Sequence, residues 1–216
     1  MVQFKSYDDI GVSTEGHVAT IEIQRPPHNF FDYSLIQQIA DAMETIDKDN
    51  NLRCVVLCAQ GKSFCAGANF GSDGSSANRS QENNPTDKSS HLYVEAVRLF
   101  ATKTPIVGAI QGAAIGGGLG LSLVPDFRVA CPESRFAANF TRLGFHPGFG
   151  LTHTLPALIG NQRATLMFYT SRRIKGEEAY EWGLADMLVP LEEVRTAATD
   201  LAKEISENSP LGVMET

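Results

Sequence analysis

The sequence is poor in cysteine, in long apolar runs and in positive charge, and each shortage excludes a class of protein. Its four cysteines form no C-x-x-C pair and no zinc-ligand spacing, so neither a disulfide scaffold nor a structural zinc site is expected. No stretch reaches the ~18 apolar residues of a membrane span, and the first residues lack the apolar core of a signal peptide. We therefore expect a protein of the reducing cytoplasm with no membrane partner and no bound metal.

The charge balance argues against nucleic acid as a partner. Lysine and arginine number 18 against 25 aspartates and glutamates, which gives a net charge of −7. Binding to nucleic-acid phosphates needs a basic face, and such a composition does not favour one. A small polyanionic ligand held by a few local cations stays compatible with it.

Buried strands alternate with helical patterns along the chain. Strand-like runs lie at residues 18–24, where apolar and polar residues alternate, and at residues 53–59, 105–110 and 127–130, which are mostly apolar. Helical spacing predicts helices over residues 33–49 (after the N-cap candidate Asp32), 90–101 and 116–124, and the remainder is mainly helical in pattern. Residues 71–90, rich in Gly, Ser and Asn, predict a mobile surface loop. The fold class is therefore α/β, and the length suits one domain.

Two glycine-rich turns follow predicted strands, at residues 61–70 (GKSFCAGANF) and 111–120 (QGAAIGGGLG). The first fails as a phosphate-binding loop because Val56 stands where that motif needs its first glycine. The second fails as a dinucleotide fingerprint because Leu121 or Leu123 takes the last glycine position. Tight turns in which glycine only relieves steric strain are one alternative.

The other alternative is that both turns present free backbone N–H groups to a ligand. Glycine lets the main chain approach a ligand closely, and the first N–H groups of a helix have no partner within it. Two converging donors would form an oxyanion hole, which suits a thioester carbonyl as it becomes an enolate or a tetrahedral anion. The spacing of about 50 residues does not by itself show that the two turns meet.

The paired segments 64–69 (FCAGAN) and 111–118 (QGAAIGGG) resemble those of the enoyl-CoA hydratase/isomerase (crotonase) family. Further pieces of the resemblance follow in family order: residues 25–29 (RPPHN), 125–130 (PDFRVA), Phe136 with 143–144 (LG), 147–150 (PGFG) and 179–186 (AYEWGLAD). The resemblance implies a crotonase-like (ClpP/crotonase) ββα spiral over residues 1–190. It also implies a C-terminal helical region, of which we expect only the start, residues 191–216, in this chain.

The resemblance also implies the roles of individual residues. The backbone N–H groups of Ala68 and Gly117 would be the oxyanion donors, and residues 116–118 would open the supporting helix. The other implied substrate-binding residues are Arg25, Pro27, Ala66, Gly67, Asn69, Phe70, Gly116 and Gly118, with Arg25 and Lys62 as candidate cations for phosphates. The expected substrate is an acyl-CoA thioester, so coenzyme A enters as part of the substrate and no cofactor is bound permanently. The expected assembly is a homotrimer or a dimer of trimers.

The sequence departs from the family hydratases where those enzymes carry two glutamates. Gly120 and Phe140 stand at these positions, and neither side chain transfers a proton, so ordinary water addition is doubtful. His146 is a candidate replacement acid/base, with a purely structural histidine as the alternative. Asn139 could orient a polar acyl group, and Phe140 suggests an apolar or aromatic acyl pocket.

Two kinds of function stay open at this point. One is an acyl-CoA lyase, isomerase, hydrolase or decarboxylase that uses His146 or, less directly, the helical pair His91 and Glu95. The other is an acyl-CoA-binding protein without catalytic activity, because both glutamates are absent.

Overall fold

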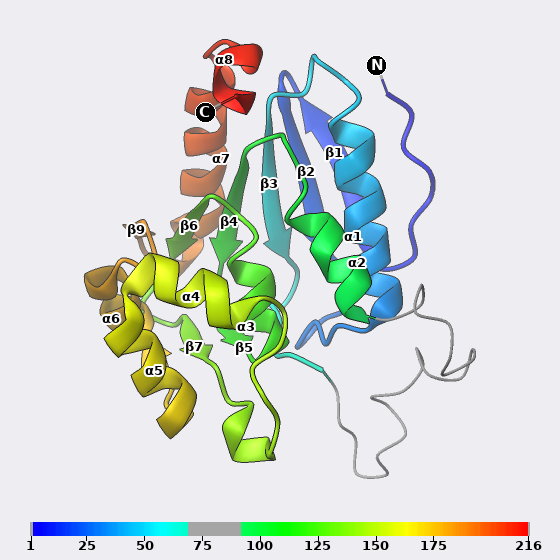
Figure 1. The fold of residues 1–216 in the computed structure, drawn as a ribbon. Coiled ribbons are helices and arrows are strands. Elements are labelled where there is room, and N and C mark those ends of the chain that lie inside the picture. Colours follow the sequence, from blue (N-terminus) through cyan, green and yellow to red (C-terminus); the bar gives the residue numbers. More distant parts are fainter. Residues whose placement is uncertain (1, 69–91, 216) are drawn as a thin grey trace, which may run out of the picture.

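The computed structural model describes residues 2–68 and 92–215. Residues 69–91, and with them the predicted loop at 71–90, lie outside the described part. Two sheets and their covering helices build the α/β fold that the sequence predicts (Figure 1).

The main sheet has six strands in the order β1-β2-β3-β4-β6-β9. Its strands are β1 (Ile10–Glu15), β2 (Val18–Ile23), β3 (Cys54–Ala59), β4 (Ile106–Ile110), β6 (Phe127–Ala130) and β9 (Met187–Leu188). The β1–β2 pair is antiparallel and turns at Gly16, where φ is 59°, whereas every other pair in this sheet is parallel. All residues of β3 and β4 are buried, as expected for parallel strands covered on both faces.

A second, smaller sheet was not predicted from the sequence. It consists of β5 (Ala113–Ile115), β7 (Arg135–Ala137) and β8 (Ile174–Lys175), in the order β5-β7-β8. The expectation of a mainly helical remainder is therefore wrong at β7, β8 and β9. Strands of two or three residues are too short to show a period of two, and distant partners define them.

Helices cover both faces of the main sheet (Figure 1). One face packs against α1 (Tyr33–Ile46) and α2 (Leu92–Leu99), and the other packs against α7 (Val194–Ser206). The predicted N-cap is confirmed, because the Asp32 carboxylate accepts the N–H of Leu35 at 3.0 Å. The helix ends at Ile46, three residues before the predicted end at residue 49.

In Figure 1 the remaining helices lie mostly above and beside the small sheet, and the last of them lies at the top, beside the end of α7. They are α3 (Gly117–Ser122), α4 (Leu151–Ile159), α5 (Asn161–Thr170), α6 (Gly176–Trp182), α8 (Pro210–Met214) and the 3-10 turns η3 (Thr141–Leu143) and η4 (Leu191–Glu193). Within residues 2–68 and 92–215, no helix combines the length and the apolar character that crossing a membrane requires.

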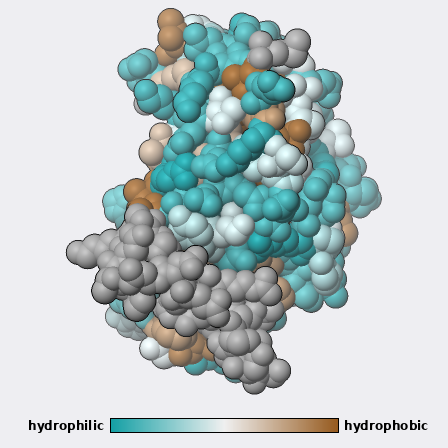
Figure 2. All heavy atoms as spheres, turned by 90° about the vertical axis from the view of Figure 1, so that its right-hand side faces the viewer, coloured by the Kyte–Doolittle hydropathy of each residue, from teal (hydrophilic) through white to brown (hydrophobic). Residues whose placement is uncertain are grey.

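An ion-pair network fastens α2 to α1. Arg98 of α2 contacts Asp41 and Glu44 of α1, each at 2.7 Å, and also pairs with Glu95 in its own helix. The buried Glu95 accepts a further hydrogen bond from the Tyr33 hydroxyl at 3.1 Å. Outside the grey residues, the face that carries α1 and α2 is largely hydrophilic (Figure 2).

Candidate functional site

The two glycine-rich turns lie side by side, joined by main-chain hydrogen bonds. The N–H of Cys65 donates to the carbonyl of Ala113 at 2.9 Å, and the N–H of Ile115 donates back to the carbonyl of Cys65 at 3.0 Å. A Cβ at Gly67 would lie 2.7 Å from the Ile115 carbonyl oxygen, and one at Gly118 would overlap the Cys65 carbonyl. Only glycine allows this approach, so the glycines do more than form tight turns.

Each turn holds a predicted donor whose backbone N–H is unused. Gly116 donates its N–H to Ala137, and the first bond within α3 runs from Gly120 to Gly116 at 3.2 Å, so the amides of Gly117, Gly118 and Leu119 find no backbone acceptor among the described residues. Phe31 bonds to the carbonyl of Gly67 at 3.1 Å and leaves the amide of Ala68 unused. Among the described residues, neither the amide of Gly117 nor that of Ala68 has an acceptor. The structure thus brings the two predicted donors onto adjacent segments.

Aromatic and amide side chains surround the turn that opens α3. A Cβ at Gly117 would overlap the ring of Phe31. At Gly116, where φ is 58°, a Cβ would lie 3.0 Å from Oδ1 of Asn139 and 4.0 Å from the ring of Phe140. Both side chains are partly buried, and the Asn139 carboxamide makes no hydrogen bond with any described residue. The predicted positions 139 and 140 therefore lie beside the donor at 117.

Another phenylalanine fills the place of a side chain at position 120. A Cβ at Gly120 would lie 2.5 Å from Cβ and 2.7 Å from Cγ of Phe149, which is far inside ordinary contact distance. The ring of Phe149 packs edge-on against Phe31, with centroids 5.9 Å apart. Sequence reasoning missed Phe149, and the only signal was its place between two glycines.

A buried asparagine ties the turn at residues 25–29 to residues 60–63, at the start of the first glycine-rich turn. The side chain of Asn29 accepts the N–H of Arg25 at 3.0 Å and donates to the carbonyls of Gln60 and Ser63, each at 2.7 Å. Its backbone is left-handed, with φ of 50°, a conformation that asparagine tolerates. Pro27 lies in the same turn, and Ala66 bonds to the carbonyl of His28 at 2.9 Å. The sequence did not single out Asn29.

The two candidate cations of this region differ in availability. The guanidinium of Arg25 pairs with Asp32 at 2.9 Å and donates from Nε to Asp9 at 2.6 Å. Burial opposes its charge, but these two carboxylates outweigh that effect and raise the pKa of Arg25. Lys62 is exposed at the neighbouring turn and forms no ion pair with a described residue. Lys62 is therefore the better placed of the two for an anionic ligand.

No hydrogen bond or ion pair joins the other predicted residues of the described part to the two turns. His146 is exposed in the loop between η3 and α4, three residues before Phe149. Glu95 is held by Tyr33 and Arg98 at the contact between α1 and α2. Asn69, Phe70 and His91 lie outside the described residues.

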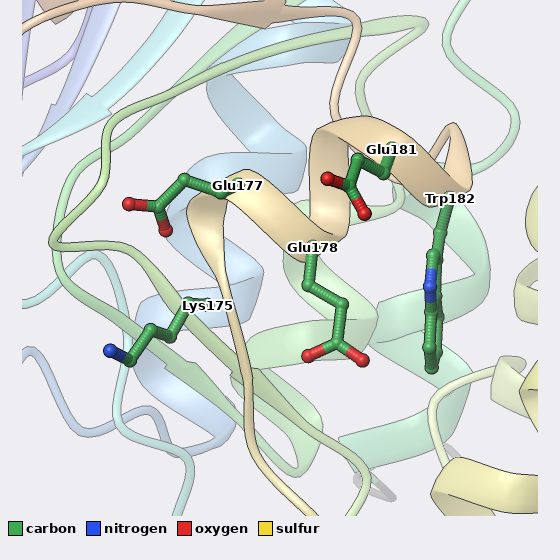
Figure 3. A pocket seen from close by; sticks show the side chains of 5 residues that line it. All are labelled: Lys175, Glu177, Glu178, Glu181 and Trp182. Atoms are coloured by element: carbon green, nitrogen blue, oxygen red, sulfur yellow. The ribbon is translucent and has the colours of Figure 1, made fainter.

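A surface hollow on α6 offers different chemistry. It is lined by Lys175, Glu177, Glu178, Glu181 and Trp182, and the side chains of Glu178 and Trp182 point to the same side (Figure 3). Three carboxylates against one ammonium repel an anionic ligand. Among the described residues, no group of three or more His, Cys, Asp or Glu side chains could hold a metal ion.

Known proteins share both the sequence and the fold. The family model "Enoyl-CoA hydratase/isomerase" matches residues 13–215. A Bacillus subtilis protein provisionally named enoyl-CoA hydratase/isomerase YngF is 34% identical over 201 residues, which cover 92% of this chain and 76% of the relative. The 1,2-epoxyphenylacetyl-CoA isomerase of Escherichia coli is 26% identical over 208 residues, covering 92% of this chain and 76% of that one.

A solved structure confirms the fold that the sequence resemblance implied. The crystal structure of an enoyl-CoA hydratase from Bacillus anthracis superposes with a TM-score of 0.84 at 31% identity, covering 96% of this chain and 80% of that one. The crotonase-like α/β fold is thus confirmed. With the family match over residues 13–215, it shows that this chain belongs to the enoyl-CoA hydratase/isomerase family, whose members act on acyl-CoA thioesters.

Proposed function

We propose that this protein binds an acyl-CoA thioester and stabilises the negative charge that develops on the thioester oxygen. The donors are the backbone N–H groups of Ala68 and Gly117. The observation that carries the proposal is the pairing of the two turns through Cys65, which sets two unused amides on adjacent segments. Removing one such donor from an oxyanion hole typically costs about 2.7–4 kcal/mol of transition-state stabilisation.

The two donors would lower the reaction barrier because negative charge develops on the thioester oxygen during the reaction. When a base removes a proton from the carbon next to the carbonyl, the electron pair of the C–H bond moves onto the thioester oxygen. Two fixed N–H dipoles aimed at that oxygen are worth more on the enolate than on the neutral thioester, so they lower the barrier. The protein provides these donors from its main chain, which keeps them in place whatever the side chains are.

Coenzyme A lies along the turn at residues 25–29, which Asn29 ties to residues 60–63. Residues 25–27 and 66–70 form its channel, and Lys62 contributes the local positive charge for the phosphates. Coenzyme A arrives as part of the substrate, and no cofactor is bound permanently. Residues 116–118 and Asn139 contact the acyl end, where the carboxamide of Asn139 has no partner among the described residues.

The reaction is an isomerisation or a related proton transfer rather than ordinary hydration. Positions 120 and 140 hold glycine and phenylalanine, so they cannot activate water. His146 is the residue proposed to carry the proton, because its loop leads directly to Phe149, which packs beside position 120. The isomerase relative in Escherichia coli, named for an epoxidised phenylacetyl-CoA, fits an aromatic or apolar acyl group beside Phe140.

A protein that binds acyl-CoA without turnover is the second candidate. The packing of Phe149 into the place of a side chain at 120 favours it, because this site has no room for an acid there. Turnover of any CoA thioester that disappears in His146→Ala, with binding retained, would exclude the second candidate and identify the base.

Calorimetry with two matched ligands tests the oxyanion donors. An acyl-CoA thioester should bind more tightly than the S-alkyl-CoA thioether of equal length, because only the thioester has a carbonyl oxygen. Ala68→Pro removes the N–H and should abolish the difference, whereas Ala68→Gly keeps the N–H and should retain it. Equal affinity for both ligands in the wild type would refute the proposal.

The assembly is a homotrimer or a dimer of trimers, and the compartment is the cytoplasm. Four buried free thiols suit a reducing compartment. Light scattering coupled to size-exclusion chromatography tests the assembly, and a mass of one chain would refute it.

A further inference from the structure

Position 120 lies on the same side of α3 as the proposed donor at Gly117, one turn further along the helix. The three atoms nearest to a Cβ at this position all belong to Phe149, at 2.5, 2.7 and 2.8 Å. Real Cβ contacts are not this short. The nearest of these atoms is the Cβ of Phe149, so any side chain at position 120 requires residue 149 itself to shift and not only its ring to rotate.

Phe149 itself is held firmly. Its side chain is 2% exposed, and its ring packs edge-on against both Phe31 and Phe100, with centroid distances of 5.9 and 6.3 Å. Its backbone is left-handed, with φ of 56°, which costs a bulky residue about 1–2 kcal/mol. Strain of this kind persists only where the surrounding packing imposes it, and it is commonest at functional sites.

These contacts make one continuous wall. The ring of Phe31 lies against Gly117, the ring of Phe149 lies against Phe31, and Gly120 lies under Phe149. The wall is aromatic from the oxyanion donor to the position where the family hydratases carry an acid. It presents no group that holds or activates a water molecule.

We propose that Phe149 is a specificity-determining residue of the acyl site. Its side chain keeps water away from position 120, so the protein catalyses proton transfer and not hydration. The inference rests on the proposed function. The substrate class is a CoA thioester with an unsaturated, apolar acyl chain. A proton leaves the α carbon of a 3-enoyl thioester, the electrons delocalise onto the thioester oxygen, and a proton returns at the γ carbon. The double bond moves, and no water is consumed.

The packing half of the proposal is tested by a double-mutant cycle. Gly120→Ala should lower the denaturant midpoint in the wild type, yet leave it unchanged or raise it in a Phe149→Gly background, which removes the Cβ of residue 149 together with the ring. Phe168→Ala is the matched control, because it truncates a buried phenylalanine of α5 whose ring is not among the atoms nearest position 120. Equal effects of Gly120→Ala in all three backgrounds would overturn the proposal.

The chemical half is tested by hydration of a 2-enoyl-CoA. Gly120→Glu/Phe149→Gly should hydrate it at least tenfold faster than the wild type and than Gly120→Glu/Phe168→Ala, because an acid then has room. A folded double variant that binds the thioester but shows no gain would overturn the inference alone. Failure of the wild type to prefer thioester over thioether in calorimetry would overturn the proposed function and the inference together.

Discussion

Backbone atoms occupy the space beside the glycines of the two turns. A Cβ at Gly118 would overlap the carbonyl of Cys65, and one at Gly112, where φ is 64°, would overlap the carbonyl of Lys62. A side-chain neighbour could rotate away, but a main-chain neighbour moves only with its whole segment. These two glycines therefore set how closely the turns approach, and with it the relative position of the two donors.

Gly118→Ala should destabilise the protein by about 1–3 kcal/mol, as overpacking does, although alanine has the higher helix propensity. Urea unfolding measures this, and calorimetry should show weaker thioester binding. Gly212→Ala in α8 is the matched control, because its Cβ would meet only Ser209, at 3.7 Å. That variant should be neutral or slightly more stable. Equal stability of the two variants would contradict the steric account.

Asn29→Ala should loosen the turns proposed to hold coenzyme A. The change leaves two buried carbonyl oxygens and one N–H without their partner, at about 1–3 kcal/mol each where no water replaces it. Free coenzyme A should bind less tightly, and unfolding should occur at lower urea. Asn208→Ala removes an exposed side chain that bonds only within its own helix end, so it should change neither measurement.

At the scale of elements, α2 depends on α1 for its polar contacts. Arg98→Met keeps an unbranched apolar stem but removes the guanidinium, which leaves Glu95, with 8% of its side chain exposed, without its cation. Removing one partner of a buried ion pair lowers the free energy of unfolding by about 3–5 kcal/mol. Because Arg98 is partly exposed, we expect a loss of about 3 kcal/mol or less for Arg98→Met. Hydrogen exchange should rise in residues 92–99.

Lys5→Met provides the comparison, because Lys5 pairs with the same Asp41 but is 59% exposed. Exposed pairs are typically worth at most ~1 kcal/mol, so this variant should be close to wild type and should leave exchange in α2 unchanged. Equal losses in the two variants would show that the buried carboxylate of Glu95 is not the cause.

The ion pairs of Arg98 also make the stability of the protein depend on pH, and the direction follows from the pKa shifts of its partners. Hydrogen bonds from Arg98 hold the pKa of Glu44 below its usual value, and at Asp41 the bonds from Lys5 and Arg98 lower the pKa although burial opposes them. This stabilisation is present above about pH 4 and is lost as the pH falls through the lowered folded values. The stability difference between wild type and Arg98→Met should therefore shrink between pH 7 and pH 3.

An exposed arginine without such partners should show no such trend. Arg173→Met removes an exposed cation that forms no ion pair with a described residue. Its difference from wild type, measured by urea unfolding at the same two pH values, should stay constant. A shrinking difference there as well would mean that net charge, rather than the network, causes the effect.

Elements with long apolar runs could be predicted from the sequence, and those defined by distant partners could not. Residues 53–59 are apolar except for Arg53, and residues 105–110 are apolar throughout; they form β3 and β4, each of which starts one residue later than predicted. The strands of the small sheet are two or three residues long, and β7 is recognisable only through its pairing with β5 and β8. No local pattern encodes such a pairing.

The candidate site shows the same division. The glycine turns could be found because their motif is local, and the family resemblance related them to each other. Phe149 could not be found, because its role depends on contact with Gly120, which lies 29 residues earlier in the chain, before β6, β7 and η3. The partnership of Asp9 and Asp32 with Arg25 was also invisible until the fold brought them together.

Across the whole molecule, the main sheet separates two apolar layers that hold the four buried cysteines. Cys54, Cys58 and Cys131 belong to the layer under α7, whereas Cys65 lies in the other layer, between the glycine turns. Burial raises the pKa of Cys54 and Cys65 to about 12 and that of Cys58 to about 11. Because these thiols have a higher pKa in the folded than in the unfolded state, the folded state has its full stability below the unfolded pKa of ~8.5. The free energy of unfolding decreases as the pH rises above that value.

The position of Cys65 makes it a reporter of the proposed site. In the native protein at pH 8, thiol reagents should label all four cysteines slowly, because reaction needs an opening that exposes the thiol. An opening at Cys65 separates the two turns, so it cannot occur while a thioester is bound there. At a concentration of 100 Kd the thioester should slow labelling of Cys65 by about 100-fold, which follows from mass action.

Cys54 provides the internal control, since fraying of α7 exposes it without disturbing the turns. Its labelling should slow less than that of Cys65, as measured by mass spectrometry of proteolytic peptides over time. Full unfolding exposes both thiols and abolishes binding, so under denaturing conditions the two rates should converge. Labelling of Cys65 that is unaffected by saturating thioester would mean that the ligand binds away from the paired turns, and the proposed oxyanion site would have to be abandoned.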